Sequence, residues 1–173
     1  RFTILITGGS QGASAINSVF IKAFKKIREK GMDPLVIHQT GQAEFEKVAK
    51  EYRENGLEAD IRPFIQDMPT AYGQSDIVIG RAGAGTVFEL AAMGKPSILI
   101  PYPYAADDHQ TSNARMLSGA GGAIVIRQDD LEPKRLAEIL AGFMRDRTAL
   151  EKMARQAGKA ARPEAAREIA DQI

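Results

Sequence analysis

Cysteine is absent from this chain of 173 residues, and histidine occurs only twice. These absences exclude disulfide frameworks and thiolate chemistry, and they argue against a metal site built from several histidines. A lack of cysteine is also consistent with a reducing compartment. Charge of one sign is not in excess either, because the formal net charge is +1. We therefore expect no general attraction to nucleic acid.

Long hydrophobic runs are missing as well. No segment reaches the roughly 18 consecutive apolar residues of a membrane-spanning helix, and the first residues lack the organisation of a signal peptide. We therefore expect a soluble, cytosolic domain. The chain starts at Arg1 within a strand pattern and without methionine, which suggests a piece of a longer protein. Its length and its 44% hydrophobic content are those of one globular domain.

Short β-branched segments alternate with longer segments of helical periodicity. This alternation is typical of βα units, in which helices cover both faces of a parallel sheet. The expected strands are residues 2–7, 34–38, 60–64, 77–79, 97–101 and 123–126. We predict one α/β domain over residues 1–173, with a Rossmann-like, doubly wound parallel sheet of about six strands.

Apolar residues at steps of three and four predict two helices between the first three strands. Gly31 and Gly56 follow these helices and are typical of helix ends. Later helices are expected at residues 86–93, 109–118 and 133–144. A helical tail should cover residues 146–173, with a break or kink at Pro163.

Ligands of doubly wound folds bind outside the carboxyl ends of the strands, so the strand-to-helix loops are the candidate sites. The first is TGGSQGA, residues 7–13, in which glycines and a helix amino terminus suit a phosphate. Its candidate ligands are Gly9, Ser10, Gln11 and Gly12. The loop is not the dinucleotide fingerprint, since it lacks the first glycine, and no lysine follows as in a P-loop. A simple tight turn is the alternative interpretation.

The second loop is FIQDMP, residues 64–69. Main-chain groups beside Ile65 and Met68 could hold the edge and face of a planar base. The alternative is structural, because Asp67 is a suitable N-cap and Pro69 suits a first helical turn.

The third loop is GRAGAGTVFE, residues 80–89, where three glycines and an arginine follow a hydrophobic strand. Backbone groups and charge can meet a ligand there. Glu89 could accept two ribose hydroxyls. Spacing alone favours a capping box instead, in which Glu89 bonds back to the N–H of Thr86. The other candidates in this loop are Arg81, Gly83, Ala84 and Thr86.

The fourth loop is PYPYAADDHQ, residues 101–110, and it leads into a helix that carries Asn113. Carboxylate and amide groups cluster near this helix start, and such groups suit neutral sugar hydroxyls. His109, Gln110 and Asn113 are the candidates. Alternatively, Asp108 only caps the helix and His109 is a solvated residue of its first turn.

Together, a phosphate cradle, a base edge, a ribose acceptor and a hydroxyl-binding cluster are the parts of a nucleotide-sugar site. The motifs GGSQGA, FIQDM, RAGA with Thr86 and Glu89, and DHQ with Asn113 share their order and similar spacing with one known family. They resemble the C-terminal half of the family 28 glycosyltransferases that make lipid II in bacterial peptidoglycan synthesis. The resemblance covers essentially the whole chain.

The resemblance implies a GT-B enzyme, in which two Rossmann-like domains face each other across a cleft. The C-terminal domain holds UDP-N-acetylglucosamine (UDP-GlcNAc), and the inverting reaction moves the sugar to the C4 hydroxyl of the muramyl residue of lipid I. The N-terminal acceptor domain, which carries the proposed general base, is absent from this chain. We therefore expect donor binding without catalysis, no catalytic residue, no bound metal and no cofactor. The full enzyme should lie at the cytoplasmic face of the bacterial membrane as a peripheral protein.

The resemblance also implies a role for the nucleotide-binding residues. Ser10 and the neighbouring loop amides would meet the diphosphate, and Arg81 would lie near the phosphates. Ile65 would offer its backbone to uracil, with Met68 nearby. Glu89 would take the ribose hydroxyls.

On the sugar side, the resemblance implies that His109 and Gln110 contact N-acetylglucosamine. One departure concerns Gly85, which stands where the family commonly has a larger apolar residue, so packing over the nucleotide is expected to differ. Two alternatives remain: another UDP-sugar enzyme of the GT-B type, such as a UDP-GlcNAc 2-epimerase, or a nucleotide-binding module without chemistry.

Overall fold

The computed structural model describes residues 1–9 and 13–161. The predicted phosphate-binding residues Ser10, Gln11 and Gly12 lie outside the described residues, as does the expected kink at Pro163. Within the described part, strands and helices alternate in the predicted order. The fold is therefore a Rossmann-like α/β domain, as the periodicity indicates.

All strand pairings in the described sheet are parallel, and the strand order is β3-β2-β1-β4-β5-β6. The strands are β1 (Thr3–Thr7), β2 (Leu35–Gln39), β3 (Asp60–Arg62), β4 (Ile77–Gly80), β5 (Ser97–Leu99) and β6 (Ala123–Val125). Each expected strand is confirmed, with ends that differ by up to two residues. The order reverses direction between β1 and β4, which is the switch point where such folds bind ligands.

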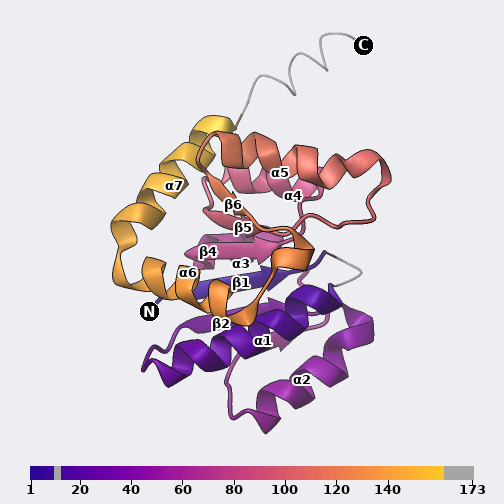
Figure 1. The fold of residues 1–173 in the computed structure, drawn as a ribbon, viewed down its shortest axis with the longest axis vertical. Coiled ribbons are helices and arrows are strands. Elements are labelled where there is room, and N and C mark those ends of the chain that lie inside the picture. The colour runs from indigo at the N-terminus through magenta and orange to yellow at the C-terminus, as the bar shows by residue number, and fades with distance from the viewer. Residues whose placement is uncertain (10–12, 162–173) are drawn as a thin grey trace.

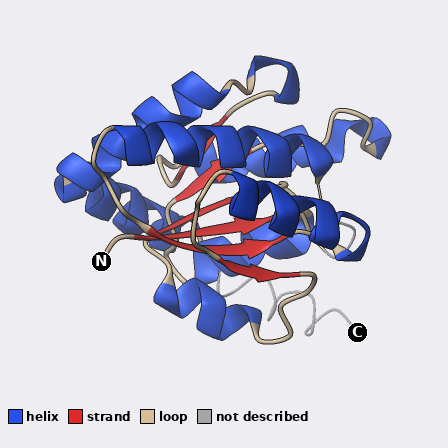
Figure 2. Ribbon diagram, turned by 90° about the horizontal axis from the view of Figure 1, so that it is seen from below, coloured by secondary structure: helices blue, strands red, loops and turns tan. Residues whose placement is uncertain are grey.

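Helices cover both faces of the sheet (Figure 2). They are α1 (Ser14–Glu29), α2 (Phe45–Glu54), α3 (Met68–Gln74), α4 (Ala84–Ala92), α5 (His109–Gly119), α6 (Pro133–Arg145) and α7 (Arg147–Ala160). Gly31 and Gly56 follow the C-caps of α1 and α2 with φ of +75° and +61°, which confirms the predicted helix ends. Figure 1 shows α7 beside the sheet, between α6 and the α4–α5 layer.

Two apolar layers fill the space between sheet and helices. Ile4 and Ile6 point into one layer with residues of α1, α2 and α6, whereas Leu5 points into the other with residues of α3, α4 and α5. Successive strand residues face opposite sides of a sheet. Because both sides are covered, β1 is buried along its whole length, as a continuous β-branched run predicts.

The switch point needs a glycine at the end of β4. A Cβ at Gly80 would lie 2.5 Å from the carbonyl oxygen of Thr7, the residue that pairs with it on β1. A side chain there would push the two strand ends apart. The loops that follow Thr7 and Gly80 therefore leave the sheet close together.

Candidate functional site

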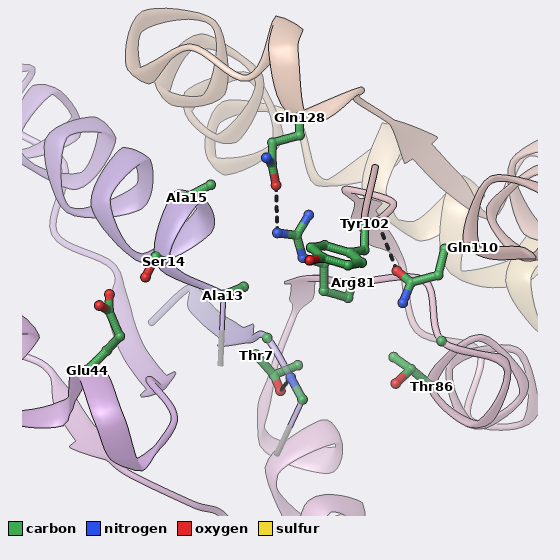
Figure 3. Close-up of a pocket in the computed structure, with 13 residues that line it drawn as sticks. Thr7, Ala13, Ser14, Ala15, Glu44, Arg81, Thr86, Tyr102, Gln110 and Gln128 are labelled. Atoms are coloured by element: carbon green, nitrogen blue, oxygen red, sulfur yellow. Dashed lines mark hydrogen bonds between the residues drawn. The ribbon is translucent and has the colours of Figure 1, made fainter. Parts of the chain in front are cut away.

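A cleft of about 630 Å³ lies at the carboxyl edge of the sheet, over the ends of β1 and β4 (Figure 3). Its lining comes from loops that are distant in the sequence. The lining residues are Thr7, Gly8, Gly9, Ala13, Ser14, Ala15, Glu44, Arg81, Gly83, Thr86, Tyr102, Gln110 and Gln128. The first, third and fourth predicted loops therefore meet at one place.

Two helices begin at this cleft without a side-chain cap. Ala13 is the N-cap of α1 and Gly83 is the N-cap of α4, and neither provides a side-chain hydrogen bond to the first turn. The first-turn N–H groups of a helix have no partner within the helix and carry partial positive charge. Both helix starts therefore suit an anionic ligand in the cleft.

Gln39, at the end of β2, connects the first loop to the second. Its Nε2 donates to Thr7 Oγ1 at 3.2 Å and to the carbonyl of Gly9 at 3.0 Å. Its Oε1 accepts from the N–H of Ile65 at 2.8 Å. Gln39 is only 2% exposed. Gln39 thus holds two candidate binding loops together.

The second loop lies outside the lining of the cleft. The N–H of Ile65 is directed to Gln39, so this group of the predicted uracil contact already has a protein partner. Asp67 accepts from the N–H of Thr70 at 3.0 Å, which confirms the capping interpretation for α3. Burial at Ile65 is nearly complete, and Met68 is partly buried. This geometry tests neither the predicted contact of Ile65 with uracil nor that of Met68.

Arg81 is the cation that faces the cleft from the end of β4. Its guanidinium donates to the carbonyls of Ile100 and Pro101 and to Gln128 Oε1 at 2.6 Å, and it lies over the ring of Tyr102 (Figure 3). Burial lowers the pKa of Arg81, and Tyr102 opposes that shift. No carboxylate of the described residues forms an ion pair with Arg81. Its charge is therefore available to an anion.

Gln110 and Asn113, both on α5, hold the third loop in place. Gln110 Oε1 accepts from the N–H of Ala82 at 3.2 Å and from that of Tyr102 at 2.9 Å. Asn113 Nδ2 donates to the carbonyl of Ala82 at 3.0 Å. Gln110 also lines the cleft, whereas Asn113 does not. The amides that we predict to bind sugar thus also lock the third loop against the fourth.

The prediction of a capping box between Thr86 and Glu89 is wrong. Helix α4 begins at Ala84, two residues before the predicted start, because Gly83 provides an extended N-cap. Thr86 is therefore already inside the helix and lines the cleft, and Glu89 lies one turn further along the same helix. Glu89 Oε2 accepts a hydrogen bond from the hydroxyl of Tyr72 at 3.1 Å. A Cβ at Gly85 would meet nothing within 4 Å, so this side of α4 is open.

His109 does not line the cleft in this structure. Its side chain is 71% exposed, and its Nε2 lies 3.7 Å from Asp107 Oδ2. Asp108 is the N-cap of α5, but its carboxylate accepts from the hydroxyl of Thr111 and not from a backbone N–H. The alternative that Asp108 caps α5 through its side chain is therefore wrong. The other part of that alternative, that His109 is a solvated residue of the first turn, is confirmed.

Comparisons with known proteins give matches that cover nearly the whole chain. The model of the glycosyltransferase family 28 C-terminal domain matches residues 3–173. The chain belongs to this family. As a family 28 domain, it is 48% identical over 168 residues to a UDP-N-acetylglucosamine–N-acetylmuramyl-(pentapeptide) pyrophosphoryl-undecaprenol N-acetylglucosamine transferase of Nitrosospira multiformis. That match covers 97% of this chain and 46% of the relative.

Two further matches of the family 28 domain agree. The transferase of the same name from Trichlorobacter lovleyi is 43% identical, over 99% of this chain and 45% of the relative. The crystal structure of MurG from Acinetobacter baumannii superposes with a TM-score of 0.88 at 36% identity, covering 99% of this chain and 51% of that one. The chain thus spans about half the length of the relatives it matches.

Four lining residues of the family 28 domain lie outside the four predicted loops, and Thr7, Gly8, Ala13 and Tyr102 lie inside those loops but were not among the predicted binding residues. Ser14 and Ala15 follow the first loop directly, and Glu44 belongs to a short helix after β2. Gln128 follows β6, so the rule that placed the other loops at the carboxyl edge of the sheet also applies to it. Of the predicted residues, Ala84, Glu89, His109, Asn113, Ile65 and Met68 are not part of the lining.

A buried polar network supports β2 beneath this site. His38 Nε2 lies 2.9 Å from Asn17 Oδ1, and its Nδ1 lies 2.8 Å from the hydroxyl of Tyr52. Burial lowers the pKa of His38 to about 3, so the imidazole is neutral at physiological pH. This histidine therefore has a structural environment. Among residues 1–9 and 13–161, no helix is long and apolar enough to span a membrane.

Proposed function

We propose that this domain binds UDP-GlcNAc as the sugar donor of a glycosyltransferase. The cleft at the switch point carries the proposal, because it joins an arginine without an acidic partner to two uncapped helix starts. This combination suits a diphosphate. The polar side chains of Thr86 and Gln110, from the third and fourth loops, line the same cleft and would be available to the sugar of such a donor.

We further propose that the complete protein transfers N-acetylglucosamine to lipid I and forms lipid II with inversion at the anomeric carbon. The names of the matching transferases support this substrate pair, because they specify UDP-N-acetylglucosamine and a pyrophosphoryl-undecaprenol acceptor. In this reaction, the bond between C1 of the sugar and the diphosphate oxygen breaks. A new bond joins C1 to the acceptor hydroxyl, whose proton goes to a base.

Within this reaction, the domain would hold the donor and stabilise the departing UDP. Arg81 and the first-turn amides of α1 and α4 supply positive charge where negative charge develops. We propose that these groups serve in place of a bound metal. The acceptor site and the base would belong to an N-terminal domain, and the undecaprenol acceptor would place the complete protein at the cytoplasmic face of the membrane.

Calorimetric titration of the purified domain tests donor binding. We expect UDP-GlcNAc and UDP to bind, UDP-GlcNAc to bind more tightly than UDP-galactose, and NADH not to bind. Arg81→Ala should weaken UDP binding by about ten- to a hundredfold, because charge-assisted hydrogen bonds contribute about 1.5–3 kcal/mol. Arg53→Ala, on the exposed side of α2, is the matched control and should bind as before.

Two other outcomes would change the proposal. Equal binding of UDP-galactose and UDP-GlcNAc would favour a UDP-sugar enzyme of different specificity or a nucleotide-binding module. A cooperatively folded domain that binds no uridine ligand would contradict the donor site itself.

A further inference from the structure

A buried tyrosine reaches an exposed carboxylate on the neighbouring helix. Tyr72 lies on α3 and is 2% exposed, and its ring packs in the apolar layer that also contains Ile65, Ala82 and Val87. Its hydroxyl donates to Oε2 of the exposed Glu89 on α4 at 3.1 Å. The ring is fixed by its packing, so the position of the hydroxyl is fixed as well.

This contact determines where the Glu89 carboxylate lies. An exposed glutamate normally samples several rotamers, and binding a ligand through it costs conformational entropy. Because the N-cap of α4 is Gly83 and not Thr86, Glu89 has no capping contact that would draw it back to the helix start. In the described residues, the Tyr72 hydroxyl is the group that hydrogen-bonds to this carboxylate. The bond uses Oε2 and leaves Oε1 available for a ligand.

We propose that Tyr72 is a positioning residue, which holds Glu89 in the orientation that accepts the ribose hydroxyls of the donor. The inference rests on the proposed function, because Glu89 lies one turn beyond Thr86, which lines the cleft where the donor would bind. Tyr72 itself does not touch the ligand. It acts by fixing one carboxylate oxygen from behind, so that the other meets the 2′- and 3′-hydroxyls without loss of rotamer freedom on binding.

The electrostatics of the pair fit this role. Burial raises the pKa of Tyr72, and the charge and hydrogen bond of Glu89 raise it further. The phenol therefore stays protonated and remains a donor throughout the physiological range. A neutral hydroxyl that donates to a carboxylate forms a charge-assisted hydrogen bond.

The test compares UDP with 2′-deoxy-UDP, because the two ligands differ only in one ribose hydroxyl. Calorimetry with the unsubstituted domain should give tighter binding of UDP by about tenfold, as expected for a hydroxyl bound to a charged group. Glu89→Gln should reduce this ratio to near one. Tyr72→Phe should reduce the ratio by about threefold while Glu89 is still present, because the carboxylate is then no longer fixed. Tyr72→Phe combined with Glu89→Gln should show no further loss.

Tyr52→Phe is the matched control. It also removes one buried phenol hydroxyl, but from the opposite face of the sheet, where the bond is to His38. Its UDP to 2′-deoxy-UDP ratio should equal that of the unsubstituted domain. Thermal unfolding of each variant separates changes of stability from changes of the ratio.

The possible outcomes separate the role of Tyr72 from the ribose role of Glu89 and from the proposed function. If Tyr72→Phe lowers the melting temperature but keeps the ribose ratio, the tyrosine is only structural and the inference is overturned. If Glu89→Gln keeps the ratio, the ribose role of Glu89 fails and the inference fails with it. If the unsubstituted domain binds no UDP at all, the proposed function is the part that fails first.

Discussion

His38 shows how the surroundings of a single side chain can reverse its expected character. By composition, histidine is the residue that titrates near neutral pH. Here it lies in the apolar layer under α1 and α2, and its two nitrogens have neutral partners in Asn17 and Tyr52. Protonation would leave a charge without a counterion inside the protein. The imidazole therefore stays neutral in the folded state.

This burial makes the stability of the domain depend on pH. The unfolded chain binds a proton at His38 below the ordinary pKa of 6.5, whereas the folded chain binds it only near pH 3. Stability is therefore complete above pH 6.5 and decreases as pH falls toward 3. We expect a loss of about 2 kcal/mol between pH 7 and pH 5, measured by urea unfolding.

His38→Gln should remove most of this loss, because no group that titrates between pH 5 and pH 7 then remains in the network. His109→Gln changes the other, solvated histidine and should leave the loss intact. The assignment would be refuted by a His38 variant that loses as much stability between pH 7 and pH 5 as the unsubstituted domain.

Helix α7 and the loop before β6 illustrate how closely the elements pack. A Cβ at Gly122 would lie 2.6 Å from the Cα and 2.8 Å from the nitrogen of Ala157 on α7. We expect Gly122→Ala to destabilise the domain by about 1–3 kcal/mol, because it forces the helix away from β6. Gly142→Ala is the control: it lies inside α6, where an added Cβ meets nothing within 4 Å, and it should stabilise by about 0.5–1 kcal/mol. Urea unfolding of both variants checks the signs, and equal signs would contradict this packing.

The limits of the elements were largely predictable because the signals are local. Continuous β-branched runs predict buried parallel strands, and Gly31 and Gly56 end the first two helices through their positive φ. The start of α4 was not predictable in the same way. A glycine N-cap such as Gly83 leaves no side-chain signal, so the capping-box spacing placed the start two residues too late.

The cleft depends on the arrangement of the whole molecule. Substitution of Gln39, which connects two of the loops, tests how strongly UDP binding depends on that arrangement. Its amide joins the loop after β1 to the loop after β3, through bonds to Thr7, Gly9 and Ile65. We expect Gln39→Leu to leave buried partners unsatisfied, at a cost of about 1–3 kcal/mol in stability. UDP binding should weaken by about tenfold or more, because the displaced loops line or flank the cleft.

Calorimetry and thermal unfolding check this prediction together. Gln74→Leu, at the exposed end of α3, is the matched control and should change neither UDP affinity nor stability appreciably. Unaltered UDP affinity in a folded Gln39→Leu domain would show that the two loops act independently.

For the unsubstituted domain, UDP at 100 times its Kd should add about 2.7 kcal/mol to the free energy of unfolding.

The order of strands and helices, the faces they bury and the loops that carry glycine follow from the sequence itself, because periodicity and glycine conformation act over a few residues. The partners of the site residues do not. Arg81 meets Gln128 across 47 positions, and Tyr72 meets Glu89 across 17. Such pairs exist only because the strand order places β4, β5 and β6 side by side and packs α3 and α4 around β4. No local pattern encodes that juxtaposition, so tertiary packing alone decided which candidate residues form one cleft.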